Sequence, residues 1–137
     1  EVARRFGSQC MVLSVEAKRR PGGGWEAYTD NGREHTGLDV LDWVTQAVER
    51  GAGEVLLTAV DQEGTRKGLD IELLRAVNAR VNVPVIISGG YAEPVDLARA
   101  DAAGASGVAI ADALHWDRST LPAIKRQAHE QGLEVRL

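Results

Sequence analysis

The sequence predicts an α/β protein in which four strand–helix units follow one another within a single domain, residues 1–137. Short apolar runs alternate with longer stretches whose apolar residues recur at helical spacing. The clearest run, 54–60, is too short for a stand-alone helix and suits a strand buried on both faces. The junction at 51–53 recurs in kind at 104–107, each time ending a helix and beginning a strand. Strands separated by helices imply right-handed crossovers and a parallel sheet.

Four strands are predicted from runs rich in β-branched and aliphatic residues. They are expected at 10–17, 54–60, 83–88 and 108–111. Cys10 opens the first of them, and we expect it to be buried there as a small hydrophobe. Because it is the only cysteine, no internal disulfide can form, which suits a reducing, cytoplasmic compartment.

Four helices are predicted from apolar stripes and from capping residues at their ends. They are expected at 39–50, 70–82, 93–103 and 120–131. Asp70 and Ser119 are the predicted N-caps of the second and fourth helices. Pro94 suits the first turn of the third helix, and Asn82 is expected to end the second.

Residues 25–36 are predicted to form a hairpin on the loop after the first strand. They follow a glycine-rich break, and Asp30-Asn31-Gly32 is a strong tight-turn signal. The basic run 18–20 before the break is either a solvated loop or an anion site. Residues 1–5 resemble the last turn of a helix whose beginning is absent, so we expect the chain to start inside a larger ancestral sequence.

The composition argues against several classes of function. A formal net charge of −4 gives no reason to expect nucleic acid or an acidic membrane surface as partner. No stretch approaches the roughly 20 apolar residues of a membrane span, and no signal peptide is visible. His35 and His115 lack the spaced partners of a zinc site. We therefore expect no metal and no cofactor.

Two closures of a four-stranded parallel sheet are open at this point. The units can form an open three-layer sandwich, or they can form half of a (βα)8 barrel, which normally takes about 250 residues. Periodicity alone does not separate the two. In both, ligands bind beyond the carboxyl ends of the strands, which is where the acidic tip 61–64 lies.

Several short stretches together match one known family. They are Phe6-Gly7-Ser8-Gln9-Cys10, Val15-Glu16-Ala17-Lys18-Arg19, Thr36-Gly37-Leu38, Asp42-Trp43-Val44, 50–58, 61–65, Gly68-Leu69-Asp70, 84–90 and Val135-Arg136-Leu137. Through them the chain resembles the C-terminal half of the cyclase subunit of imidazole glycerol phosphate synthase. The resemblance covers essentially the whole chain. It implies a (βα)4 half-barrel that corresponds to strands five to eight of the family's barrel.

The resemblance also implies a function. In that family, the cyclase takes ammonia from a glutaminase partner in histidine biosynthesis. It converts a bis-phosphorylated ribulosyl aminoimidazole carboxamide into imidazole glycerol phosphate and the purine precursor AICAR. Two aspartates act as general acid and base, one from each half-barrel, and each half supplies one phosphate site. A phosphorylated small-molecule ligand and a glutaminase subunit are therefore the implied partners.

Two glutamates stand where the family has aspartates at its site. Glu16 occupies the position of the catalytic aspartate of this half, and a carboxylate there can transfer protons. Its extra methylene moves the oxygens by about an ångström, a shift that can cost roughly 10²-fold in rate. Glu16 is thus either a retained acid/base or a tip residue without efficient catalysis. Glu63 lies beside Gly64, whose backbone N–H helps to hold phosphate in the family, and the matched Asp61 is expected to cap the loop.

Two further strand tips complete the phosphate site that the resemblance implies. Ser88-Gly89-Gly90 lets backbone N–H groups approach an anion near the start of the next helix. Ala111-Asp112 replaces alanine–serine, and a carboxylate facing a phosphate repels it unless Asp112 turns away or is protonated. Tyr91-Ala92 replaces a smaller pair and is expected to crowd the site.

The remaining acidic positions have two interpretations each. Glu54 corresponds to a gate-like charged ring at the family's ammonia entrance, or it is a glutamate paired with an arginine. Glu16, Glu63 and Asp112 would share one rim, where a hard divalent cation could bind, but the prediction is a site without metal.

Four parallel strands leave two open edges. A symmetric homodimer, in which two half-barrels close one eight-stranded barrel, is the economical remedy. Two functions stay open. The first is a cyclase-like half-barrel that acts on or binds phosphorylated ribulosyl aminoimidazole carboxamide-type ligands. The alternative is a non-catalytic half-barrel, a relic or a man-made scaffold, that self-assembles and at most binds phosphate.

Overall fold

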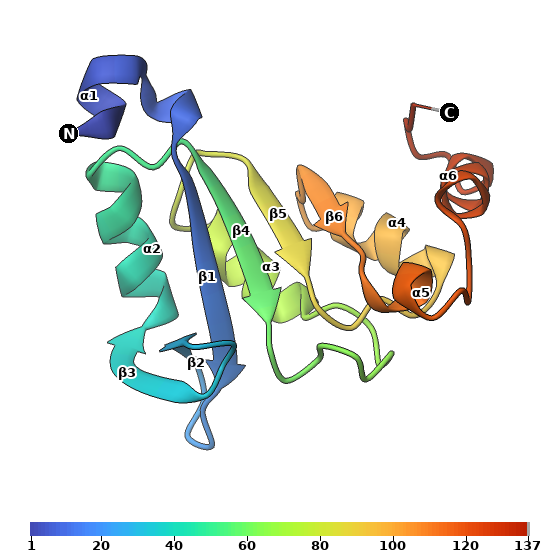
Figure 1. Ribbon diagram of the computed structural model, residues 1–137, viewed down its shortest axis with the longest axis horizontal. Coiled ribbons are helices and arrows are strands. Elements are labelled where there is room, and N and C mark those ends of the chain that lie inside the picture. Colours follow the sequence, from blue (N-terminus) through green and yellow to red (C-terminus); the bar gives the residue numbers. More distant parts are fainter. Residues whose placement is uncertain (137) are drawn as a thin grey trace.

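The computed structural model describes residues 1–136 as strands and helices built around one sheet (Figure 1). The elements in chain order are α1 (Val2–Phe6), the 3-10 helix η1 (Ser8–Cys10), β1 (Val12–Arg19), β2 (Trp25–Thr29), β3 (Glu34–Asp39), α2 (Val40–Glu49), β4 (Glu54–Ala59), α3 (Ile71–Asn78), β5 (Val85–Ser88), α4 (Pro94–Ala102), β6 (Gly107–Ala109), α5 (Asp112–His115) and α6 (Leu121–Glu130). The four predicted strand–helix units and the hairpin are confirmed. Leu137, the end of the expected tail, lies outside the described residues.

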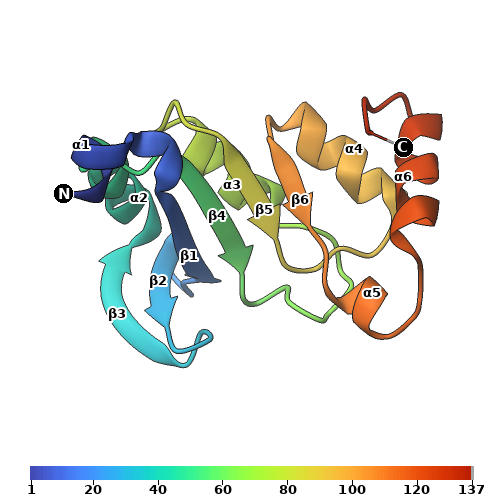
Figure 2. The same cartoon turned by 45° about the horizontal axis from the view of Figure 1, so that its top comes forward.

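The six strands form one sheet in the order β3-β2-β1-β4-β5-β6. The strands β1, β4, β5 and β6 pair in parallel, whereas the hairpin β2–β3 joins β1 antiparallel. Helices α2, α3 and α4 lie on one face of the parallel strands, and within residues 1–136 no helix covers the other face (Figures 1 and 2). A three-layer sandwich needs helices on both faces. The architecture is therefore a (βα)4 half-barrel.

Burial along the strands shows that only one face of the sheet is covered. In β4, Val55, Leu57 and Ala59 are buried, and the residues between them are partly exposed. Because side chains alternate between the two faces of a strand, the buried set is the one that faces the helices. The largest fully buried side chains of this core are Leu57, Leu73, Leu74, Ile87, Val15, Val40, Val44, Val55, Val77 and Val85. The expectation that 54–60 is buried on both faces is wrong, because the second layer that would cover the open face is not part of these residues.

The hairpin pairs with only the C-terminal half of β1. The paired stretch is Glu16–Arg19, so the edge of β1 at 12–15 has no neighbouring strand among residues 1–136. Its turn contains Asp30, Asn31 and Gly32 with φ angles of 53°, 56° and 75°. These left-handed angles confirm the predicted turn signal. The second strand extends to Asp39, beyond the predicted 36.

The first strand begins later than predicted, and this changes the environment of Cys10. Residues Ser8–Cys10 form the 3-10 helix η1, and β1 starts at Val12 instead of at 10. Cys10 is exposed, and its thiol lies 3.3 Å from the Phe6 carbonyl oxygen. The expectation of a buried cysteine is wrong, because Cys10 precedes the sheet and is not covered by the helix layer.

Several boundaries in the second half also differ from the prediction. Helix α3 ends at Asn78 instead of 82, and Thr120, not Ser119, caps α6. The short helix α5 after β6 was not predicted, because four residues are too few for a periodic pattern. The longest helices of residues 1–136 have 10 residues, and none of them could cross a bilayer.

Asp70 joins three segments that are far apart in the sequence. It is nearly buried, and its carboxylate caps α3 by accepting the Leu73 N–H at 3.0 Å. It also accepts hydrogen bonds from the Arg19 guanidinium at 3.0 and 3.1 Å and from Trp25 Nε1 at 3.0 Å. The guanidinium lies 4.9 Å from the centre of the Trp25 ring. One carboxylate thus holds the end of β1, the hairpin and the start of α3 together.

The basic run 18–20 lies at the end of β1 and beyond it, and its side chains contact protein groups although Arg19 stays exposed. Arg19 pairs with Asp70, and Arg20 lies 3.6 Å from the Asp39 carboxylate. The Lys18 ammonium lies 4.6 Å from the centre of the Tyr28 ring. The three positive charges therefore fasten the hairpin to the body of the sheet.

Replacement of Asp70 by alanine is expected to lower the free energy of unfolding by about 2–4 kcal/mol. The Trp25 and Leu73 N–H groups would lose a buried acceptor, and α3 would lose its N-cap. Urea unfolding followed by circular dichroism measures the change. Glu72→Ala is the matched control, since Glu72 pairs with the same Arg19 but its side chain is 73% exposed. The control should cost less than about 1 kcal/mol. Equal effects of the two substitutions would contradict the role of Asp70.

Candidate functional site

One row of side chains crosses the open face at the carboxyl ends of the strands. In the sheet register Glu16 lies beside Thr58, Thr58 beside Ser88, and Ser88 beside Ala109. Partners in register share a face, and all four residues are partly exposed. Two of the residues chosen from the sequence, Glu16 and Ser88, therefore lie on one surface. Thr58 between them was not singled out, because a threonine inside an apolar strand carries no chemical motif.

The Glu16 carboxylate is tied to the turn of the hairpin. Its Oε2 accepts the N–H of Gly32 at 2.8 Å, and Tyr28 is its neighbour on β2. Among residues 1–136 no hydrogen bond reaches the second oxygen. The hairpin therefore fixes the direction of the side chain and leaves one oxygen available for a proton of a ligand.

A small crevice brings together most of the residues predicted for phosphate. Its lining consists of Glu63, Gly89, Gly90, Tyr91, Ala109, Ile110, Ala111 and Asp112. They come from the loop after β4, the loop after β5, and the end of β6 with the loop behind it. The crevice has a volume of about 10 Å³, which is room for about one water molecule. A larger ligand would have to sit at its mouth, above the strand ends.

Gly89 and Gly90 bring backbone N–H groups to this crevice. Both are buried, with φ angles of 95° and 94°. A side chain at Gly89 would meet the Ala59 carbonyl oxygen, and one at Gly90 would meet the Gly68 carbonyl oxygen. The N–H of Gly89 follows Ser88, which pairs with Ala109 of β6, whereas for the N–H of Gly90 no acceptor is found among residues 1–136. Since buried N–H groups are almost always paired with protein, water or ligand, the Gly90 N–H can donate to an anion or a water molecule.

Tyr91 occupies the wall of the crevice and narrows it. The residue is 7% exposed. Burial raises the pKa of its phenol above the ordinary value, and the charge of Asp96 raises it further, so Tyr91 is a neutral, bulky wall at neutral pH. The crowding expected of Tyr91 agrees with the small volume of the crevice.

Asp112 does not present a free carboxylate to the crevice. Its Oδ2 forms an ion pair with Arg118 NH1. The Asp112 side chain is 17% exposed, against 38% for Arg118. Arg118 escaped the sequence analysis because it follows Asp112 by six residues in a loop, where spacing predicts no contact. Asp112 lines the crevice, and the ion pair is a third way to relieve repulsion, different from the turning away and the protonation that were considered.

The loop after β4 supplies the other acidic positions. Asp61 Oδ2 accepts the Arg19 N–H at 2.7 Å, so it ties this loop to the end of β1. Glu63 is exposed and its backbone N–H donates to the Ala59 carbonyl. Gly64 has a φ of 71° and open space around it, and it does not line the crevice. Gly64 and Ser88 thus lie near the rim but outside the crevice itself.

Glu54 lies at the opposite end of the sheet. It pairs in register with Val12 at the amino ends of β4 and β1, and it is partly exposed. The arginine partner that one interpretation required is not found among residues 1–136. It lies on the open face, at the end of the sheet away from the rim.

Two of the three histidines, His35 and His115, contact neighbouring side chains. His35 Nδ1 lies 2.8 Å from the Tyr28 hydroxyl and 3.3 Å from Glu26, and His115 packs edge-on against Trp116. The hydrogen bond from the Gly37 N–H lowers the pKa of the Glu26 carboxyl below its ordinary value, and the neighbouring His35 lowers this pKa further. Among residues 1–136 no three His, Cys, Asp or Glu side chains gather as a metal set.

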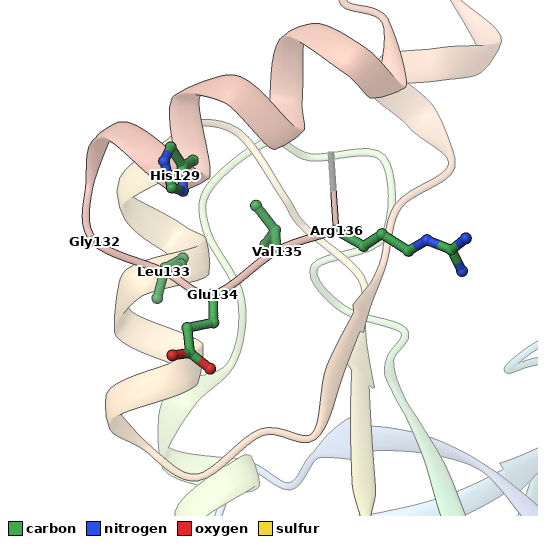
Figure 3. A pocket seen from close by; sticks show the side chains of 6 residues that line it. All are labelled: His129, Gly132, Leu133, Glu134, Val135 and Arg136. Atoms are coloured by element: carbon green, nitrogen blue, oxygen red, sulfur yellow. The ribbon is translucent and has the colours of Figure 1, made fainter.

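Two larger hollows lie away from this rim. One, of about 430 Å³, is formed by the end of α6 and the tail 132–136. In Figure 3 Val135 points toward α6, whereas the Arg136 guanidinium extends away from it. The other, of about 530 Å³, lies between α4, β6 and α6. The tail is at the amino ends of the strands (Figure 1). Ile110 lines both the second hollow and the crevice, but neither hollow is lined by Glu16, Ser88 or the two glycines.

The chain has the fold of an α/β half-barrel. In barrels of this kind, ligands bind at the carboxyl ends of the strands, where the N–H donors and carboxylates described above lie. The comparison with protein families makes the assignment specific. Residues 1–120 match the family described as histidine biosynthesis protein. The chain belongs to this family.

Curated relatives carry the name imidazole glycerol phosphate synthase subunit HisF. The protein of Legionella pneumophila is 63% identical over 90 residues, which are 66% of this chain and 42% of the relative. The protein of Gluconacetobacter diazotrophicus is 44% identical over 99% of the chain and 53% of its own length. That of Dehalococcoides mccartyi is 43% identical over 98% and 53%. The chain thus spans about half the length of the relatives it matches.

Replacement of Gly89 by alanine is expected to destabilise the fold by about 3 kcal/mol. Two energetic costs add: the left-handed backbone conformation disfavours a side chain, and a Cβ would clash with the Ala59 carbonyl oxygen. Chemical unfolding gives the loss. Gly22→Ala is the control, because Gly22 lies in the break before the hairpin with nothing near its Cβ position; it should change stability by less than about 1 kcal/mol. An unchanged stability of the Gly89 variant would show that this loop relaxes freely.

Proposed function

We propose that the chain is an imidazole glycerol phosphate synthase cyclase-like half-barrel of histidine biosynthesis, acting in the cytoplasm. It binds a phosphorylated ribulosyl aminoimidazole carboxamide-type ligand across the open face. The single observation that carries the proposal is the buried N–H of Gly90, for which no acceptor is found among residues 1–136, next to the row that contains Glu16. Family membership supports the same reaction class. No cofactor is needed for it, since proton transfer and anion binding come from protein groups.

In this proposal the rim binds one phosphate of the ligand. The Gly90 N–H, beside Gly89, points a positive dipole at its oxygens, and Ser88, Gly64 and the backbone of Ala111 lie around it. Glu63 and Asp112 set the acidic border of this site. Because the crevice holds about one water molecule, the phosphate lies at its mouth and the rest of the ligand extends over the open face.

Glu16 is the proton-transferring group of this half. Its position in register with Thr58 and Ser88 directs the carboxylate over the open face. One oxygen is oriented by the Gly32 N–H, which restricts the rotamers of a side chain longer than aspartate. Such orientation is what a general acid or base requires before its pKa matters.

The non-catalytic half-barrel is the second candidate function, and one observation favours it. The Glu16 carboxylate already accepts the Gly32 N–H in the hairpin turn, so it also has a structural role. Together with Glu63 and Asp112 it makes the rim more acidic than an anion site needs. A scaffold that assembles and at most binds phosphate would keep all the contacts described above without any turnover.

For its partner we propose a second copy of the chain. The edges of β1 at 12–15 and of β6 are both unpaired among residues 1–136, and Val12 is 52% exposed. The 530 Å³ hollow between β6 and α6, lined in part by Val108, Ile110 and Leu121, leaves space beside the edge of β6. A two-fold dimer would satisfy both edges at once, with β1 of each copy beside β6 of the other. A glutaminase subunit at the Glu54 end is proposed as in the family.

Replacement of Glu16 by glutamine is expected to lower ammonia-dependent turnover of the phosphorylated substrate by about 10²-fold or more, because the amide cannot transfer the proton. Formation of imidazole glycerol phosphate, followed by chromatography, is the measurement. Glu130→Gln on the exposed side of α6 removes the same charge far from the rim and should leave the rate unchanged. Equal rates of wild type and the Glu16 variant would assign the chain to the scaffold alternative.

Sedimentation analysis at micromolar concentration is expected to give twice the chain mass of 14.7 kDa. Val12→Lys places a charge at the free edge of β1 and should return the monomer mass with an unchanged circular dichroism spectrum, because a lysine at a strand edge opposes pairing. Leu38→Lys, at a hairpin residue that is 44% exposed, is the control that stays dimeric. A wild-type monomer would refute the dimer.

A further inference from the structure

The ion pair between Asp112 and Arg118 stands at the crevice that Gly89 and Gly90 line. Asp112 and Glu63 bring two negative charges to this crevice, and two carboxylates near a bound anion would repel it. Arg118 NH1 donates to Asp112 Oδ2 and lies 3.4 Å from the Asp112 carbonyl oxygen. The guanidinium therefore neutralises the carboxylate that is closest to it.

Arg118 is also restrained from a second side. Its guanidinium carbon lies 5.8 Å from the centre of the Trp116 ring, and that ring packs edge-on against His115 at 4.9 Å between centroids. Trp116 is 62% exposed, so packing in the core does not explain the position of its ring. A guanidinium over an exposed indole is an attractive cation–π contact. Trp116 and Asp112 together keep the Arg118 head group at the rim.

Most of the hydrogen-bonding capacity of Arg118 is unused. A guanidinium has five N–H donors in a planar fork, and within residues 1–136 only NH1 meets protein acceptors. The side chain is 38% exposed. Planar donor pairs of this kind suit the oxygens of a phosphate group. The N–H groups of Gly89 and Gly90 provide further donors at the same crevice.

We propose that Arg118 is a phosphate-recognition residue of this rim. It cancels the charge of Asp112 and offers its free N–H donors to a phosphate monoester that is also held by the Gly89 and Gly90 N–H groups. Asp112 in turn acts as a positioning residue, because it orients the guanidinium. The inference rests on the proposed function, since it takes the ligand to carry a phosphate.

Titration with inorganic phosphate, followed by the NMR shifts of the Gly89 and Gly90 amides, tests the role of Arg118. Arg118→Gln is expected to weaken binding by at least about tenfold, because a charged hydrogen-bond donor is lost and Asp112 is left uncompensated. Arg126→Gln is the matched control: Arg126 is exposed on α6, and removal of its charge should leave binding within about twofold. If both variants weakened phosphate binding equally, Arg118 would act only through the net charge of the chain, and the proposal would be overturned.

The double variant Asp112→Ser with Arg118→Gln tests the coupling between the two residues. Removal of the carboxylate is expected to restore at least about half of the binding free energy lost in Arg118→Gln, since contacting residues couple strongly in a double-mutant cycle. Additive effects of the two substitutions would overturn the proposed charge compensation, and the spectra of the variants report whether each one is folded.

The same titrations separate this inference from the proposed function. If wild type binds phosphate and Arg118→Gln binds it equally well, the inference fails and the phosphate site at Gly89 and Gly90 stands. If neither wild type nor Asp112→Ser shifts the two glycine amides at high millimolar phosphate, the phosphate site itself is absent and both are overturned.

Discussion

The one-sided cover of the parallel sheet is the constraint on which the other features of this chain depend. Helices α2, α3 and α4 bury every second side chain of the central strands, Leu57 and Ile87 among them. The remaining side chains have no layer above them among residues 1–136. The open face can therefore carry Glu16, Thr58 and Ser88 in register, polar groups that a closed core would accept only if they were paired. A core and a prospective ligand surface thus follow from the same alternation of side chains.

Two carboxylates at the rim of the sheet are neutralised by neighbouring donors and cations. At the end of β1, Asp70 is surrounded by donors from Arg19, Trp25 and Leu73, so its charge serves to fix the hairpin. At the end of β6, Asp112 has its own cation in Arg118. Between these two ends lies the N–H of Gly90, for which no acceptor is found among residues 1–136. The rim thus combines two engaged carboxylates, Asp70 and Asp112, with a backbone donor that can meet an anionic ligand despite a net charge of −4.

Much of the fold could be predicted because it rests on local signals. Apolar runs, the Asp30-Asn31-Gly32 turn and the Asp70 cap are decided by residues close in sequence, and all three were found in the structure. The errors occurred where burial depends on distant layers. Cys10 has a hydrophobic composition around it but precedes β1 and is exposed, and β4 is apolar on both sides although only one side is covered. Of the candidate site, the strand tips could be predicted from the order of the elements, while the grouping within the crevice could not.

The sequence by itself determined the alternation of strands and helices, the positions of the glycine and acidic residues at the strand tips, and the resemblance that the family comparison confirms. Only the tertiary structure decided which face of the sheet stays open, that Glu16 is oriented by Gly32, and that Arg118 meets Asp112. The physical reason is the range of the interactions. Propensity, periodicity and turn chemistry act over a few residues, whereas burial, strand register and ion pairs depend on the packing of segments that are distant along the chain.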